Sequence, residues 1–378
     1  MKQVLKNYEL CLTTIGPVFI GNGKELNKKE YLFLNDKKIA VMNIEKLYGR
    51  IRTKGLSMEF ERYILGKGNE TLKQWMMKNR VAVQDVKDCI DYILESGDLA
   101  VERGQRMQIM QCIKDAYGSP YIPGSSVKGM LRTILLGADL LANPGKYERD
   151  KEKFTADLWA FSGNRRRLLS GNITGMENRR YHTLGKTDQM RDAVNDELAG
   201  LIVGDSDPLD IGCLVPCQKV ECHPDGHEKK LNLLRECIRP GTEIRLPLTI
   251  DQSLCKIDEK GLEQAVRLFG QQYYENFSSR FQASDRPHGQ EVYLGGGCGF
   301  VSKTIIYPIF QKKEGIRITK TIFEKTGVPR VHKHDRDIQL GVSPHILKCT
   351  RYRGKLMQMG LCSLKITPMD AVSRAPHK

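Results

Sequence analysis

The segment that most constrains the fold is YIPGSSVKGMLRTILL, residues 121–136. Pro123 and Gly124 end an extended stretch, and Ser125 and Ser126 are residue types that commonly cap a helix. Apolar residues then recur at helical spacing, namely Val127, Leu131, Leu135 and Ala138. The sequence therefore predicts a helix that begins at about Ser126.

The start of this helix has the properties of an anion-binding site. Unpaired backbone N–H groups and the helix dipole favour negative charge at a helix N-terminus, and phosphate is a common ligand there. Lys128 adds a cation at the same end. The alternative interpretation is a plain capped helix that packs its apolar face on a sheet.

The bulk composition is that of a folded chain without membrane spans. The 378 residues are 40% hydrophobic and 28% charged, which is enough for one large or two medium domains. No apolar run approaches the ~18 residues of a membrane span, and the start lacks the apolar stretch of a secretory signal. Eleven cysteines in that setting indicate reduced thiols, and therefore a cytoplasmic protein.

The positive charge is large and unevenly distributed. The formal net charge is +15, and residues 303–355 hold thirteen Lys and Arg against four Asp and Glu, a net of +9. A smaller basic group lies in the middle of the chain, Arg165, Arg166, Arg167, Arg179 and Arg180. Clustered cations attract polyanions, of which nucleic acid is the commonest in a cell. An anionic membrane surface or an acidic protein is the alternative.

The order of elements predicts an α+β fold, an antiparallel sheet with helices on one face. Strands are expected at 8–14, 198–203, 214–222, 243–250 and 355–366, and helices from 126 and over 258–281. Residues 44–116 are expected to form a helical insertion, and 143–198 to form long surface loops. We divide the chain into a core of residues 1–250 and a C-terminal portion of residues 251–378.

A second candidate phosphate site is the loop LGGGCGFVSKT, residues 294–304. It fails the NTPase pattern G-x-x-x-x-G-K-[ST], because Ser302 stands where the second glycine should be. Its glycines still allow backbone to approach a ligand closely, and Lys303 adds charge. A sugar-phosphate backbone is therefore the expected ligand, with a tight ligand-free turn as the alternative.

Three further patterns have ordinary explanations. The group Cys213, Cys217, Cys222, His223, His227 and Cys237 lacks the paired spacing of a zinc site, and a strand over 214–222 would separate its cysteines. His332 and His334 lie in the basic tract and are expected to face RNA rather than cleave it. Asp205 and Asp207 fit an Asx turn. The sequence thus predicts no metal, no cofactor and no catalytic residue.

Together these segments resemble one family. The strings TTIGPVFIGNGKELNKKEY (13–31), YIPGSSVKGMLRTILL, LVPCQKVEC, ECIRPGTEIRL (236–246) and LGGGCGFVSKT occur in this order. They resemble the fifth Csm subunit of type III-A CRISPR–Cas effector complexes, within the RAMP superfamily. Phe19 stands where that family often has His. The resemblance covers residues 8–366, except for the insertion and the Arg-rich middle.

The resemblance implies a ferredoxin-like (RRM-like) RAMP core and a non-catalytic role in crRNA binding at the crRNA 3′ end and in crRNA maturation. It implies crRNA as ligand and other Csm subunits as partners, chiefly the third Csm subunit and the small subunit, with host nucleases recruited for trimming. The residues expected to face RNA are Gly124, Ser125, Ser126, Lys128, Gly129, Arg132, Gly295, Gly296, Gly297, Gly299, Lys303, Lys333, Arg336, Lys348, Arg351 and Arg353. The alternatives are a metal-independent repeat-RNA endoribonuclease of the same superfamily and a scaffold that mainly binds protein.

Overall fold

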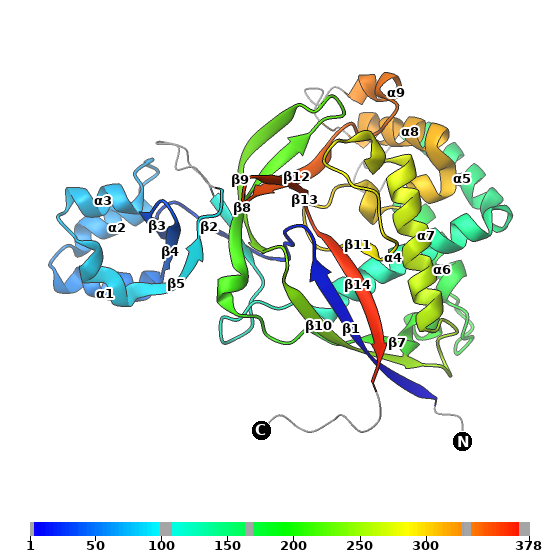
Figure 1. Cartoon of the computed structure of the whole chain (residues 1–378), viewed down its shortest axis with the longest axis horizontal. Coiled ribbons are helices and arrows are strands. Elements are labelled where there is room, and N and C mark those ends of the chain that lie inside the picture. The colour runs from blue at the N-terminus through cyan, green and yellow to red at the C-terminus, as the bar shows by residue number, and fades with distance from the viewer. Residues whose placement is uncertain (1–3, 99–107, 163–168, 327, 329–333, 370–378) are drawn as a thin grey trace.

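A computed structural model of the chain contains two large β-sheets flanked by helices, with a small lobe to one side (Figure 1). It describes residues 4–98, 108–162, 169–326, 328 and 334–369. The five-stranded sheet has the order β11–β14–β1–β10–β7 and is antiparallel throughout. Its strands are β1 (Leu5–Thr14), β7 (Leu201–Val203), β10 (Glu243–Asp251), β11 (Glu291–Tyr293) and β14 (Leu361–Pro368).

The six-stranded sheet has the order β13–β12–β8–β9–β6–β2, and its β6–β9 pair is parallel. Its strands are β2 (Gly21–Leu26), β6 (Gln108–Cys112), β8 (Leu214–Cys222), β9 (Glu228–Ile238), β12 (Leu347–Tyr352) and β13 (Lys355–Gln358). Both sheets combine strands from residues 1–250 with strands from residues 251–378. The two portions of the chain are therefore interleaved in space.

Helices cover one side of this core, as Figure 1 shows. They are α4 (Gly124–Ala142), α5 (Glu148–Ala160), α6 (Ser170–Tyr181), α7 (Glu259–Asn276), α8 (Ile306–Thr326) and the short α9 (Asp337–Leu340). The apolar stripes predicted for α4 and α7 are buried, including Leu131 and Leu262. Burying such stripes against β1, where Leu10 and Leu12 are fully buried, provides the main hydrophobic stabilisation.

The predicted insertion forms a lobe with a hydrophobic core of its own. It contains α1 (Ile44–Thr53), α2 (Ser57–Leu65) and α3 (Leu72–Lys78), packed on a sheet of β3 (Tyr31–Asn35), β4 (Lys38–Met42) and β5 (Ile90–Glu95). Trp75 lies 5.0 Å from Phe60 and 5.5 Å from Tyr63 between ring centroids. Buried Lys29 donates to the carbonyls of Ile64 and Gly66 at the end of α2. The lobe is therefore mixed α/β, not purely helical.

The expected α+β class, with helices on one side of mainly antiparallel sheets, is confirmed, and two local expectations are wrong. Residues 143–198 contain the helices α5 and α6 and are not simply long loops, although each helix buries only two hydrophobic side chains. The strand expected over 355–366 is two strands, β13 and β14, separated by a turn at Gly360 with a φ of +76°. Within the described residues, no helix is long and apolar enough to cross a bilayer.

The β1 strand provides a matched test of this core. Leu12 is fully buried, whereas Leu5 in the same strand is 48% exposed. We expect Leu12→Ala to lower the free energy of unfolding by about 2–5 kcal/mol, because it removes apolar contacts and leaves a cavity. Leu5→Ala should change it by only about 0.5 kcal/mol. Urea denaturation of both variants measures the difference, and equal effects would contradict the burial of Leu12.

Candidate nucleic-acid interface

Three backbone segments meet at glycines beside the six-stranded sheet, and we call this contact the glycine junction. It joins residues 15–19 after β1, the loop 294–299 after β11, and the β13–β14 turn. The N–H of Gly296 donates to the Phe19 carbonyl over 2.6 Å, and the N–H of Leu294 donates to the Gly360 carbonyl over 2.8 Å. A Cβ on Gly295 would lie only 2.2 Å from the Phe19 carbonyl oxygen. No other residue type fits there without moving the backbone.

Cationic side chains surround the loop of the glycine junction. The guanidinium of Arg235 on β9 lies against Gly297, where an added Cβ would be 3.0 Å from Nη1, and Lys348 on β12 lies beside Gly299. Lys219 on β8 is the third cation. Lys303, which follows the loop, is exposed. The predicted glycine loop therefore lies next to cations from three strands, two of which the sequence did not single out.

One carboxylate lies among these cations. Buried Glu221 accepts from Lys348 over 2.6 Å and lies 3.5 Å from Lys219. Burial opposes its ionisation, but the lysines outweigh burial and hold the pKa of Glu221 below its ordinary value. Burial and then the charge of Lys348 lower the pKa of Lys219. Positive charge is thus crowded here, and an anionic ligand would relieve it.

Arg235 has an unused hydrogen-bond donor. Its Nε atom is buried and finds no hydrogen-bond partner among the described residues. The guanidinium carbon lies 5.5 Å from the centroid of the buried Phe19 ring, in a cation–π arrangement. A buried donor without a partner is costly, so an acceptor supplied by a ligand would be favoured. The Phe19 ring thus packs against the Arg235 guanidinium.

The start of α4 differs from the expectation. The helix begins at Gly124, its N-cap is Pro123, and no side chain of the serine pair caps it. Instead the Gly124 N–H donates to the carboxylate of Asp205 over 2.8 Å. Gly124 fits against the chain after β7 because a Cβ would lie 2.2 Å from the Val203 carbonyl oxygen. Asp205 therefore occupies part of the predicted anion site.

Of the remaining residues predicted as RNA contacts on α4, some are exposed to solvent and one takes part in ion pairs. Ser125 and Gly129 are exposed, and Ser126 is half-buried. Arg132 pairs with Asp196 over 2.6 Å, and its guanidinium lies 4.4 Å from the Tyr181 ring centroid. Arg132 thus attaches α4 to its neighbours.

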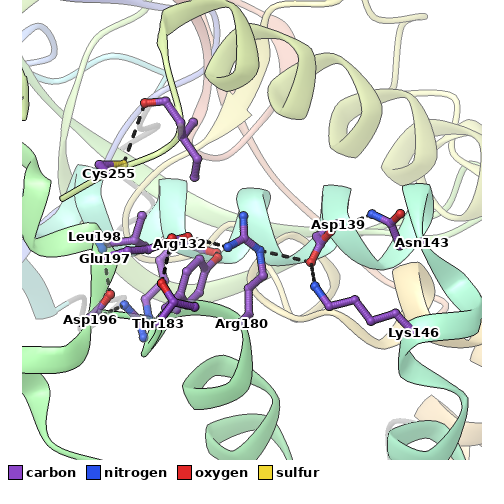
Figure 2. A network of polar contacts seen from close by, with 12 residues as sticks. Arg132, Asp139, Asn143, Lys146, Arg180, Thr183, Asp196, Glu197, Leu198 and Cys255 are labelled. Carbon is purple, nitrogen blue, oxygen red and sulfur yellow. Dashed lines mark hydrogen bonds and ion pairs between the residues drawn. The ribbon is translucent and has the colours of Figure 1, made fainter. Parts of the chain in front are cut away.

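Figure 2 shows how this network continues along α4. Asp139 is 2.8 Å from Lys146 and 3.1 Å from Arg180, which also pairs with Glu197 over 2.5 Å. Near the start of α4, the pKa of the Lys128 ammonium group is lowered, and the main cause is its burial. Arg180 of the predicted basic group therefore forms internal ion pairs, while Arg165, Arg166 and Arg167 lie outside the described residues.

In the basic tract 303–355, too, some cations form ion pairs and others are exposed. Arg351 makes two contacts with Glu228, at 2.6 and 3.1 Å. Arg336 is exposed, and Arg353 is exposed with its guanidinium over the Tyr352 ring. Lys333 lies outside the described residues. The tract therefore does not present all its charge on one surface.

The two predicted phosphate sites are separate. The glycine loop follows β11 at one edge of the five-stranded sheet, and the start of α4 lies beside β7 at the other edge. Four strand spacings span about 19 Å. They are therefore two positions on the molecule, and not one pocket.

The cysteines and histidines are arranged in a way the sequence only partly indicated. All eleven cysteines are free, and Cys217 and Cys222 lie in hydrophobic clusters on opposite faces of the six-stranded sheet, as predicted.

Asp205 serves as a helix cap rather than in an isolated Asx turn. His334 contacts the buried carboxylate of Asp337, a residue that no sequence motif pointed to. His332 lies outside the described residues.

The sequence of the chain matches a known superfamily. The sequence profile of the RAMP superfamily matches residues 11–341. The chain therefore belongs to the RAMP superfamily, and the RAMP fold class expected from the sequence is confirmed.

Relatives in sequence show which family of this superfamily the chain belongs to. Csm5 of Mycobacterium tuberculosis is 30% identical over 399 residues, covering 97% of this chain and 99% of the relative. Csm5 of Streptococcus thermophilus is 28% identical over 349 residues, covering 88% and 90%. The chain belongs to the Csm5 family, which confirms the resemblance seen in the sequence.

Solved structures share the fold. A chain of a Csm–crRNA–target RNA ternary complex from a type III-A CRISPR–Cas system has a TM-score of 0.65 at 20% identity, covering 95% of this chain and all of that one. The crystal structure of Csm5 from T. onnurineus has a TM-score of 0.59 at 18% identity, covering 93% and 99%.

The glycine junction can be tested with a pair of glycines that share backbone geometry. Gly295 has a φ of +84° and Gly23 a φ of +82°, but a Cβ on Gly23 would meet no atom within 4 Å. Alanine at either position costs about 1–2 kcal/mol for the left-handed conformation. We expect Gly295→Ala to cost a further ~1–3 kcal/mol from the clash with Phe19. Equal unfolding free energies for the two variants would contradict the close packing at Gly295.

Proposed function

We propose that this chain is a non-catalytic, crRNA-binding subunit of a type III-A Csm complex. The observation that carries the proposal is the glycine loop closing over Lys219, Arg235 and Lys348, with a buried arginine donor that has no partner among the described residues. Phosphate oxygens are acceptors that would satisfy both the crowded charge and the free donor. The Csm5 relatives and the fold shared with a chain of a Csm–crRNA–target RNA complex support crRNA as the ligand.

The proposed contacts recognise the RNA backbone and not its sequence. The glycine loop offers closely approachable backbone, and the surrounding side chains offer cations. A subunit that binds guides with varying spacers requires this kind of contact. In the proposal, Gly295, Gly296, Gly297, Gly299 and the nearby cations contact the ribose-phosphate strand, with the exposed Ser125 and the half-buried Lys128 at the start of α4 as a second contact. The exposed Arg336 and Arg353 would extend the basic surface, and Lys333 stays an expectation from the sequence.

The family supports a position for the subunit within the complex. We propose that it lies at the crRNA 3′ end, contacts the third Csm subunit and the small subunit, and contributes to 3′-end maturation by positioning host nucleases. It would act in the cytoplasm.

Removal of a charge that touches phosphate should be visible in the salt dependence of RNA binding. Lys303 is exposed, so Lys303→Ala should weaken binding of single-stranded crRNA without affecting folding. The slope of log Kd against log salt should fall by roughly 0.7 for each phosphate contact that the substitution removes. Arg267→Ala removes an exposed cation on α7 and serves as the control. A slope that stays unchanged in Lys303→Ala would contradict phosphate contact by Lys303.

Arg235→Gln tests the buried donor in the same assay. It should weaken binding more than Lys303→Ala does, because the buried site is less screened by salt. If the isolated wild-type chain retains no RNA, the alternative of a scaffold that mainly binds protein would replace the proposal.

The absence of catalysis is a separate prediction. We expect purified protein to leave repeat RNA intact, with or without EDTA, because none of the proposed contacts is a general base positioned against a 2′-hydroxyl. Gel analysis of end-labelled RNA measures this. Cleavage at a defined site that disappears in His334→Ala would instead establish the endoribonuclease alternative.

A further inference from the structure

Four of the chain's eight histidines gather in one place. His227 and His223 belong to the β8–β9 hairpin, His345 precedes β12, and His334 begins the short helical turn before α9. Their ring centroids follow one another at 5.6 Å from His227 to His223, 5.4 Å from His223 to His345, and 5.0 Å from His345 to His334. The residues come from segments about 110 positions apart, so the cluster is a product of the tertiary fold.

A fully buried carboxylate contacts two of these four histidines. Asp337 has an exposed fraction of 0%, and its two oxygens face different histidines. Oδ2 is 3.0 Å from Nδ1 of His334, and Oδ1 is 2.5 Å from Nδ1 of His345. The hydroxyl of Ser343 donates to Oδ2 over 2.5 Å. The side chains of His334 and His345 are only 10% and 7% exposed, so this group is shielded from water.

We propose that His334, Asp337 and His345 bind a divalent transition-metal ion, for which Zn²⁺ is the best match. Their candidate ligand atoms all lie within 4.8 Å of one another. Two imidazole nitrogens and a carboxylate oxygen form a donor set that Zn²⁺ accepts, whereas Mg²⁺ and Ca²⁺ prefer oxygen ligands alone. This inference is independent of RNA binding, and it departs from the sequence-based prediction of no metal.

The distances suit an ion that enters between the three groups. Tetrahedral Zn²⁺ with bonds of about 2.0–2.2 Å separates its ligand atoms by roughly 3.3–3.5 Å. The present separations of 2.5 and 3.0 Å between Asp337 and the two histidines would therefore open by about an ångström or less. Ser343 would then hold the carboxylate as an outer hydrogen-bond partner, a usual arrangement around metal ligands.

His223 lies next to this group, with its ring centroid 5.4 Å from that of His345. The register of β8 and β12 pairs Cys222 with Leu347, which brings the next residue, His223, alongside the segment that carries His345. A metal held by His334, Asp337 and His345 would join the start of α9 to the segment before β12. Because the unfolded chain does not hold the ligands together, ion binding would stabilise the folded state.

Metal content of the full chain tests the proposal. Protein stripped with a chelator, dialysed and then incubated with Zn²⁺ should retain about one ion per chain, measured by mass spectrometry of the metal. Its melting temperature should rise with Zn²⁺ but not with Mg²⁺. His345→Ala and His334→Gln should abolish both the bound ion and the thermal shift. His288→Ala, which removes an exposed histidine before β11, should keep both.

A spectroscopic measurement keeps the test decisive if a variant folds poorly. Co²⁺ bound to wild-type protein should give the visible absorption of a tetrahedral site. His334→Gln, which keeps a polar side chain of similar size, should abolish that absorption while circular dichroism stays unchanged. Wild-type protein that retains no more Zn²⁺ than His345→Ala, or a Co²⁺ spectrum unaffected by His334→Gln, would overturn the proposal.

Discussion

The glycine junction is the constraint on which the rest of the interface depends. At Gly16 a Cβ would lie 1.9 Å from the Gln358 carbonyl oxygen, and at Gly360 it would lie 2.1 Å from Cys298 Sγ. Together with Gly295, these positions let the chain after β1, the loop after β11 and the β13–β14 turn touch backbone to backbone. Such contacts leave no freedom in the path of the loop. They therefore hold the loop against the face that carries Arg235 and Lys348.

The charged residues of this protein either form internal ion pairs or lie on a basic face. The two groups contribute differently to the stability of the fold. An exposed ion pair contributes only about 0–1 kcal/mol, so the many surface pairs say little about stability. The network of Arg132 and Arg180 is partly buried and orients α4 against α6 and the following loop. Beside the glycine loop, Lys219 and Lys348 share one carboxylate, Glu221, and positive charge stays in excess. That excess distinguishes the candidate interface from the structural network.

Much of the secondary structure could be predicted because its residues alternate or repeat with one period. β1 and β8 were predicted closely, and α7 lies inside its predicted range. The helices α5 and α6 were missed because each buries only two hydrophobic residues, which leaves no apolar stripe to recognise. α8 was missed because Gln311, with a φ of 57°, interrupts it. β9 carries Lys229 and Lys230 at its start, where charged residues hide the strand pattern.

The sequence by itself determined the family, the fold class, and the glycine loop and helix start as candidate phosphate sites, because motifs and periodicity are local. Only the tertiary structure decided which cations stay available, since Asp196 neutralises Arg132 and Glu228 neutralises Arg351 across long sequence separations. The capping of α4 by Asp205 and the meeting of His223 with His345 were decided in the same way. The physical reason is that hydrogen bonds and ion pairs depend on distances in space, which strand register and helix packing set.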